Sequence, residues 1–269
     1  MLAAQIEGIG FWAPGLPSWQ AARDFIRTGS LAADAPRRPS PQLLPPNERR
    51  RTPDTVAIAL DVALAACHAA GRDPATLPSV FASTHGDHAI TDYMCETLAR
   101  EPRTVSPTRF HNSVHNAASG YWTIGTRSHR PATAISALDA SFAQGLLEAL
   151  LQLAAGEEAV LLAAYDGNAN GPVGRQWHSK GLLAGALLLS QSGAETGPVL
   201  QAELVDGVPP PADGPLSRHA GSNAMAPMLP LFEALAHGAP AAVALAAGPG
   251  RVLSVTLLPG AAAMESVDA

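Results

Sequence analysis

Short apolar runs alternate with segments of helical spacing along most of the chain, and this alternation limits the possible folds more than any other feature. The run from Ser79 to Thr84 is typical of a buried strand, and His88 to Arg100 follows it with a helical pattern. The expected strands are 3–12, 79–84, 132–138, 159–165, 184–190, 199–205 and 251–258, and the expected helices are 19–28, 54–70, 88–100, 112–126, 140–155 and 225–237. This order predicts an α/β layered fold with a mostly parallel central sheet and helices on both faces.

Two proline-rich stretches interrupt the alternation. Residues 31–53 contain six prolines among polar residues, and Val208 is followed directly by Pro209, Pro210 and Pro211. Because proline lacks the backbone N–H that regular elements need, we expect loops over 31–53 and 206–224. A length of 269 residues with 47% hydrophobic side chains suits a single domain over residues 1–269.

Composition argues against several partners and locations. The net charge is −6, and the one basic cluster, Arg49–Arg51, is too short to form a nucleic-acid track. Cys67 and Cys95 both fall in expected helices, which favours free thiols in a reducing compartment. The N-terminus lacks the basic region of a signal peptide, and residues 181–194 and 234–250 are too short or too interrupted to span a membrane. We therefore predict a cytoplasmic protein that binds no nucleic acid and has no membrane span.

Common cofactor and nucleophile motifs are missing from the sequence. It contains no Gly-x-Ser-x-Gly elbow, no Gly-x-Gly-x-x-Gly after a strand and no Walker lysine loop. No cofactor is therefore predicted.

Two pairs of histidines are candidates for chemistry. His111 and His115 are four residues apart in an expected helix, a spacing that places two metal ligands on one face, although a third ligand is missing. Packing at a helix start is the commoner role for such a pair, and we predict no metal. His85 and His88 flank Asp87 directly after a strand, where Asp87 is expected to cap the following helix.

The junction between the expected strand 132–138 and the next helix is where an α/β enzyme would place a nucleophile. It offers Asp139 and Ser141. At the start of a helix, Asp139 could act as a carboxylate nucleophile, as an electrostatic group or as a cap, and capping is the commonest of these roles.

Three motifs around this junction carry a family resemblance. They are Pro102–Phe110, Asn116–Gly120 and Ala134–Asp139. In order and spacing they resemble the Arg-x-Val-Ser-Pro, Asn-x-Ala-x-Gly and Ser-Thr-Ala-Cys segments of the β-ketoacyl synthases of thiolase-like fold. The looser match runs from Ile6 to about Ser190, which implies a single half of the duplicated synthase fold and makes residues 206–269 a divergent C-terminal extension.

A narrower resemblance concerns short synthase-like proteins. Leu44–Arg51, His111–Asn116, Tyr121-Trp122 and Asp139–Ala143 are similar to the chain length factors of aryl polyene biosynthesis clusters. By this resemblance Asp139 occupies the position of the synthase cysteine. A carboxylate cannot hold an acyl group as a productive thioester, and the histidines of the second synthase half have no counterpart here.

The resemblance therefore implies a non-catalytic subunit of a 3-oxoacyl-ACP synthase complex. The chain would form a heterodimer with a complete β-ketoacyl synthase, meet the acyl carrier protein through that complex, and help to shape the acyl tunnel. The residues assigned to the tunnel or the interface are Phe110, His111, Ser113, Val114, His115, Asn116, Ile135 and Leu138. Asp139 would then serve as a helix cap.

Two other functions remain open. One is a stand-alone acyl-thioester decarboxylase or hydrolase that uses Asp139 with His111 or His85. The other is a metal-binding protein that uses His111 and His115.

Overall fold

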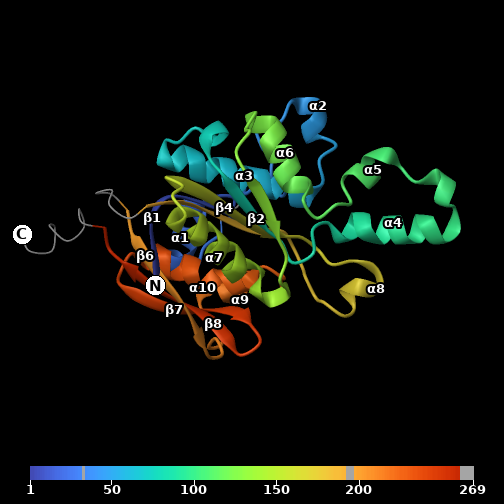
Figure 1. Ribbon diagram of the computed structural model, residues 1–269. Helices are drawn as coiled ribbons and strands as arrows, with labels where there is room; N and C mark the ends of the chain where they lie inside the picture. Colours follow the sequence, from blue (N-terminus) through green and yellow to red (C-terminus); the bar gives the residue numbers. More distant parts are fainter. Residues whose placement is uncertain (32–33, 192–196, 261–269) are drawn as a thin grey trace, which may run out of the picture.

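The computed structural model describes residues 1–31, 34–191 and 197–260. Within them, eight strands form one sheet in the order β3-β2-β4-β5-β1-β6-β8-β7 (Figure 1). The strands are β1 Leu2–Trp12, β2 Ser79–Ala82, β3 Ala132–Ile135, β4 Ala159–Asp166, β5 Leu183–Ser190, β6 Val199–Asp206, β7 Ala241–Gly248 and β8 Arg251–Leu258. The helices are α1 Trp19–Thr28, α2 Pro46–Arg49, α3 Asp54–Ala70, α4 His88–Arg100, α5 Pro107–His111, α6 Ala117–Thr126, α7 Ser141–Ala154, α8 Gly171–Gly174, α9 Pro215–Ala220 and α10 Leu229–His237. The described residues also form the short 3₁₀ segments η1 Pro74–Thr76, η2 Pro102–Thr104, η3 Leu138–Ala140 and η4 Ala226–Met228.

The layered α/β fold with helices on both faces is confirmed, but the sheet is mixed rather than mostly parallel. β2 is parallel to β3 and to β4, whereas the pairings β4–β5, β5–β1, β1–β6, β6–β8 and β8–β7 are antiparallel. The parallel strands are joined through helices, as crossover connections require. The segment between β4 and β5 holds only the short α8, so the chain returns antiparallel.

Each face of the sheet carries its own hydrophobic core. α3 and α6 cover one face, where Phe81 and Trp122 are fully buried, and α1, α7, α9 and α10 cover the other, where Phe142 and Phe232 are fully buried (Figure 1). A Cβ atom at Gly10 of β1 would overlap the carbonyl oxygen of Val62, so glycine is what lets α3 lie this close to the sheet.

Helices predicted at 19–28, 54–70 and 88–100 have those bounds in the structure. The helix predicted over 112–126 is wrong in its first part, because α5 ends at His111 and α6 begins at Ala117. The short helix α5 precedes the gap. Ser106 caps α5 by accepting a hydrogen bond from Arg109 N, and Pro107 suits the first helical position.

Elements also form within regions predicted as loops. α2 lies within 31–53 and α9 within 206–224, each with a proline at its first position. The alanine-rich β7 was not predicted, since alanine has a low β propensity; it forms by pairing with β8. β7 and β8 extend the main sheet beside β6, so these two strands belong to the same layer as the other six.

Candidate functional site

The carboxyl ends of the three parallel strands bring distant segments together. β2 leads into Ser83–Asp87, β3 leads into Ser136–Asp139, and β4 ends at Asp166. Crevices at the carboxyl ends of parallel strands are the usual place for ligand sites in α/β folds. This edge of the sheet is therefore the candidate site.

Asp166 is the central polar residue of this edge. Its side chain is fully buried and accepts hydrogen bonds from Ser83 Oγ at 2.7 Å, Thr84 N at 2.9 Å and His85 N at 3.2 Å. Burial raises the pKa of the Asp166 carboxyl, although these hydrogen bonds act to lower it. Asp166 thus fixes the loop that follows β2.

Asp139 lies at the turn between β3 and α7 with an exposed side chain. The preceding Leu138 has φ +52°, a left-handed conformation that is rare outside glycine. The predicted capping role of Asp139 is wrong: the N-cap residue of α7 is Ala140, and no side chain caps that helix. Instead Ser141 Oγ accepts from Ala137 N and donates to the Leu138 carbonyl oxygen, which leaves the Asp139 carboxylate free to face solvent.

Three histidines gather around the loop after β2. The rings of His85 and His88 contact edge to face with centroids 4.3 Å apart, and Trp177 lies 6.2 Å from His85. His115 Nε2 is 2.8 Å from the carbonyl oxygen of Ser83.

Burial lowers the pKa of both His85 and His88. The charge of Asp139 partly opposes this effect at His85, whereas His115 adds to it. Asp87 caps α4 as predicted, because its side chain accepts a hydrogen bond from Ile90 N.

The geometric argument for a metal pair at His111 and His115 fails. Residues 112–116 are not helical, so the two rings do not share a helix face. His111 faces Tyr121 with ring centroids 6.0 Å apart, whereas His115 approaches Ser83. Among the described residues, no group of three or more possible ligands could hold a metal ion.

Phe110, Ser113, Val114 and Asn116 of the predicted set lie on or near α5, which extends with α4 beyond the sheet (Figure 1). Phe110 is 61% exposed and Val114 is 49% exposed. Ser113 Oγ donates to the Phe110 carbonyl oxygen at 2.8 Å. The carbonyl oxygen of Asn116 accepts from Gly120 N in the first turn of α6. His115 of the predicted set approaches the loop that carries His85, through the Ser83 carbonyl oxygen.

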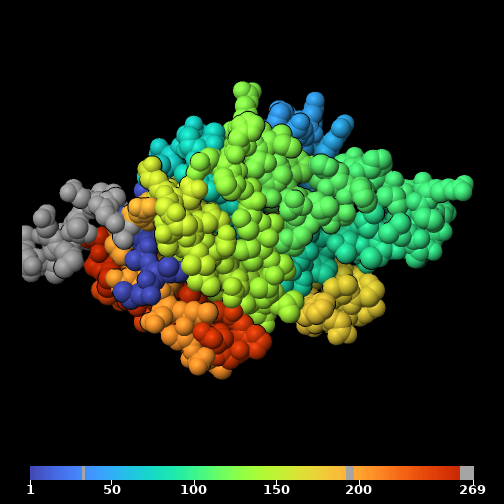
Figure 2. Space-filling view, in the orientation of Figure 1, coloured from blue at the N-terminus to red at the C-terminus, as the bar shows by residue number. Residues whose placement is uncertain are grey.

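Ile135 and Leu138 belong to a different surface, the outer edge of the sheet. β3 is the last strand on this side, and α6 and α7 flank it on the two faces. Ile124 of α6 is 74% exposed, Leu151 of α7 is 48% exposed and Leu138 is 53% exposed. The two helices form much of the face seen in Figure 2.

A cavity of about 920 Å³ opens beside Asp139. It lies between Asp139, the segment His178–Lys180, the segment 209–224 with α9, and β7. Sequence reasoning missed this wall, because 206–224 was interpreted only as a loop. Asp166 was also missed as a site residue, and its position at the end of an apolar strand was the one available signal.

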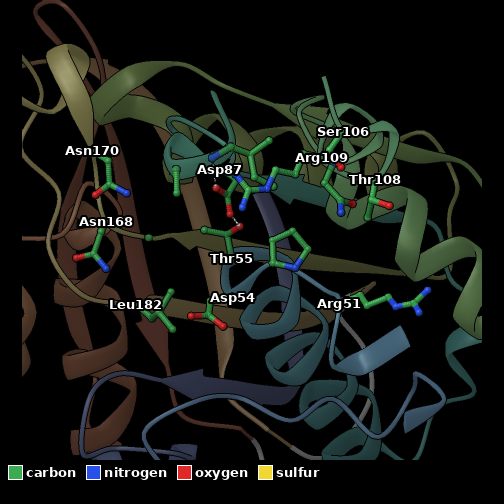
Figure 3. Close-up of a pocket in the computed structure, with 15 residues that line it drawn as sticks. Arg51, Asp54, Thr55, Asp87, Ser106, Thr108, Arg109, Asn168, Asn170 and Leu182 are labelled. Atoms are coloured by element: carbon green, nitrogen blue, oxygen red, sulfur yellow. Dashed lines mark hydrogen bonds between the residues drawn. The ribbon is translucent and has the colours of Figure 1, made fainter. Parts of the chain in front are cut away.

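A second cavity, of about 560 Å³, lies under α5 (Figure 3). Two of its polar side chains, Thr55 and Arg109, have partners within the chain. Thr55 Oγ1 donates to Asp87 Oδ2 at 2.7 Å, as the dashed line in Figure 3 marks, and the Arg109 guanidinium stacks 4.0 Å above the ring of Tyr93.

Within the described residues, no helix has both the length and the hydropathy to cross a membrane.

Solved structures with the same fold come from ketosynthase systems. A structure of a ketosynthase (ApeO) in complex with its chain length factor (ApeC) from Xenorhabdus doucetiae matches with a TM-score of 0.75 and 23% identity, over 95% of this chain and 100% of that chain. The ishigamide ketosynthase/chain length factor matches with a TM-score of 0.73 and 16% identity, over 97% and 100% of the two chains. A type II polyketide acyl-carrier protein in complex with its ketosynthase gives a TM-score of 0.75 at 12% identity, over 96% and 99%. At these identities the matches show the fold, which is thiolase-like.

None of the curated proteins matches the sequence. A family model does: the one described as β-ketoacyl synthase, N-terminal domain, matches residues 19–241, well over half of the chain. The resemblance in the motifs that end at Asp139 is thereby confirmed, and the chain belongs to the β-ketoacyl synthase N-terminal domain family.

Proposed function

We propose that this chain is a non-catalytic, chain-length-factor-like subunit that pairs with a complete β-ketoacyl synthase and helps to shape its acyl tunnel. The neighbouring folds come from complexes described as a ketosynthase with a chain length factor, which supports such a partnership. The acyl carrier protein would meet this chain through the complex.

One observation carries the pairing: apolar side chains are exposed around an unpaired strand edge. In the described part of the chain no strand pairs with the outer side of β3, and Ile124, Leu138 and Leu151 are exposed around it. Free strand edges and contiguous apolar surface are sites of association in soluble proteins. A partner that pairs with β3 would cover both.

The proposal that this chain does not catalyse condensation depends on Asp139. Its carboxylate lies at the turn where the family has its cysteine, and it cannot form the acyl thioester from which condensation starts. Residues 88–116, which include α4 and α5 and extend beyond the sheet, form what we call the α4–α5 arm. Phe110 and Val114 expose apolar surface on this arm, and such a surface could line a partner's tunnel for a hydrophobic acyl chain.

Co-expression with the β-ketoacyl synthase encoded nearest to this chain tests the pairing. We expect the two proteins to co-elute in size-exclusion chromatography, and Ile124→Glu to abolish co-elution by placing a charge in the apolar contact. Val208→Glu is the matched control, because Val208 is 83% exposed and follows β6, a strand that four others separate from β3 in the sheet. Separate elution of the unaltered proteins, or equal behaviour of the two variants, would contradict the proposal.

A second candidate function is favoured by the position of Asp139. Its carboxylate lines a cavity of about 920 Å³ and interacts electrostatically with His85, as an acid–base pair acting on an acyl thioester would need. In that case the purified chain alone would decarboxylate or hydrolyse acyl-carrier-protein thioesters, and Asp139→Asn would abolish the reaction. Lack of turnover by the chain alone would eliminate this function.

A further inference from the structure

The cavity beside Asp139 has the size of a small-molecule site. Its volume of about 920 Å³ lies within the range of ligand pockets, which is about 300–1,000 Å³. One wall comes from the segment between β4 and β5, and the facing wall comes from residues 209–230 and β7.

The ionisable side chains that line this cavity are mostly basic. His178, Lys180, Arg218 and His219 line it, and Asp139 is the one acidic residue among the described lining residues. None of the four basic side chains forms an ion pair within the described chain. Arg218 donates to the carbonyl oxygen of Asp213, and His219 Nε2 is 2.7 Å from the carbonyl oxygen of Pro14, so both keep neutral partners only.

A buried hydroxyl in the same lining lacks a partner. Ser217 is 9% exposed, and its Oγ forms no hydrogen bond with any described residue, whereas its backbone N donates to Glu233 Oε1 at 2.9 Å. The Oγ atom has almost no accessible surface, so it does not count among the groups that a ligand in the cavity would contact.

Hydrogen bonds connect the two walls of the cavity. Asn223 is 4% exposed; its Nδ2 donates to the Gly181 carbonyl oxygen at 2.9 Å, and its Oδ1 accepts from Met225 N at 2.9 Å. Lys180 N donates to the Ser222 carbonyl oxygen at 3.0 Å. The walls are therefore already in place before a ligand arrives, which limits the entropy lost on binding.

We propose that this cavity binds a small organic anion, whose phosphate or carboxylate group contacts Lys180 and Arg218. Charge-assisted hydrogen bonds from lysine and arginine are the strongest that a protein offers to such groups. The negative charge of Asp139 opposes the ligand. This site acts without a partner subunit and is independent of the pairing proposed above.

Calorimetric titration of the purified chain alone, with inorganic phosphate and with succinate as probes, tests the site. We expect saturable binding of at least one probe, beyond any effect of sodium chloride at equal ionic strength. The probe that binds more tightly identifies the ligand group as phosphate or carboxylate. No saturable binding of either probe would overturn the proposal.

Four variants sharpen the test. Lys180→Gln and Arg218→Gln should each weaken binding about tenfold or more, since each removes one charge-assisted contact. Asp139→Asn should strengthen binding, because it removes the repelling charge. Arg103→Gln is the matched control, an exposed arginine outside the cavity, and should bind as the unaltered chain does. If Lys180→Gln and Arg218→Gln bind as tightly as this control, the assignment is wrong.

Discussion

The buried carboxylate of Asp166 accepts a hydrogen bond from Ser83 Oγ at 2.7 Å, across 83 residues of sequence. Ser83 Oγ also accepts from Gly86 N at 2.8 Å, so one hydroxyl links the end of β4 to the turn that begins α4. This turn carries His85 and is approached by His115, and Asp139 lies within electrostatic range of it. The pair Asp166–Ser83 therefore sets the geometry of the candidate site.

Replacing Ser83 by alanine should lower the free energy of unfolding by about 1–3 kcal/mol, the cost of leaving buried hydrogen-bonding groups without partners. Ser83 is fully buried, whereas Ser30 is exposed, so Ser30→Ala is the matched control and should change stability by less than about 0.5 kcal/mol. Urea denaturation measures both values. Equal stability of the two variants would mean that Ser83 does not organise this turn.

Acid should destabilise the protein through His85 and His88. Burial lowers the folded-state pKa of both below the ordinary value of 6.5, so the folded state binds fewer protons than the unfolded state. Their contribution to stability is complete above pH 6.5 and is lost as pH falls from there through the folded-state pKa values. Asp166, whose pKa is raised, acts in the opposite direction and loses stability as pH rises.

A comparison of variants isolates this histidine effect. The decrease in unfolding free energy on acidification should be smaller in His88→Gln than in the unaltered chain. Urea denaturation across this pH window measures the slopes. An unchanged slope in His88→Gln would contradict the assignment.

Replacing two glycines by alanine should change the stability of the chain in opposite directions. Gly10→Ala forces a methyl group against the carbonyl oxygen of Val62, and such overpacking costs about 1–3 kcal/mol or more. At Gly120, inside α6, an added Cβ meets no atom within 4 Å. Gly120→Ala should therefore stabilise the chain by up to about 1 kcal/mol, since alanine favours helix. Thermal unfolding of both variants checks the contrast, and a neutral Gly10→Ala would show that α3 can shift away from β1.

Local signals explain which helices were predictable. Ser18 and Asp87 cap α1 and α4, and Gly29 and Gly71 end α1 and α3 in the left-handed conformation. Strand direction was not predictable in the same way. β1 pairs antiparallel with both β5 and β6, partners nearly 200 residues away, and only the packed sheet determines that choice.

The candidate site was predictable only in part, because its geometry also depends on how distant segments pack. The resemblance located the β3–α7 turn and the aspartate in it, but the capping role of Asp139 failed because Ser141 forms the local hydrogen bonds instead. The importance of Asp166 depends on its complete burial, and Lys180 and Arg218 meet at one cavity only after the chain has folded. None of these properties is encoded in a short motif.

The tunnel-wall role leads to a prediction about products of the complex with the synthase. Val114→Trp enlarges an exposed side chain on the α4–α5 arm, so the products should become shorter while the rate of condensation is retained, because the change blocks space without touching a reacting group. Val208→Trp is the control of equal size change at a site away from the arm, and it should leave product length unchanged. Mass spectrometry of the released chains measures the length distribution. Unaltered lengths with Val114→Trp, in a complex that still forms, would show that this arm does not limit the growing chain, and the pairing through β3 would stand without it.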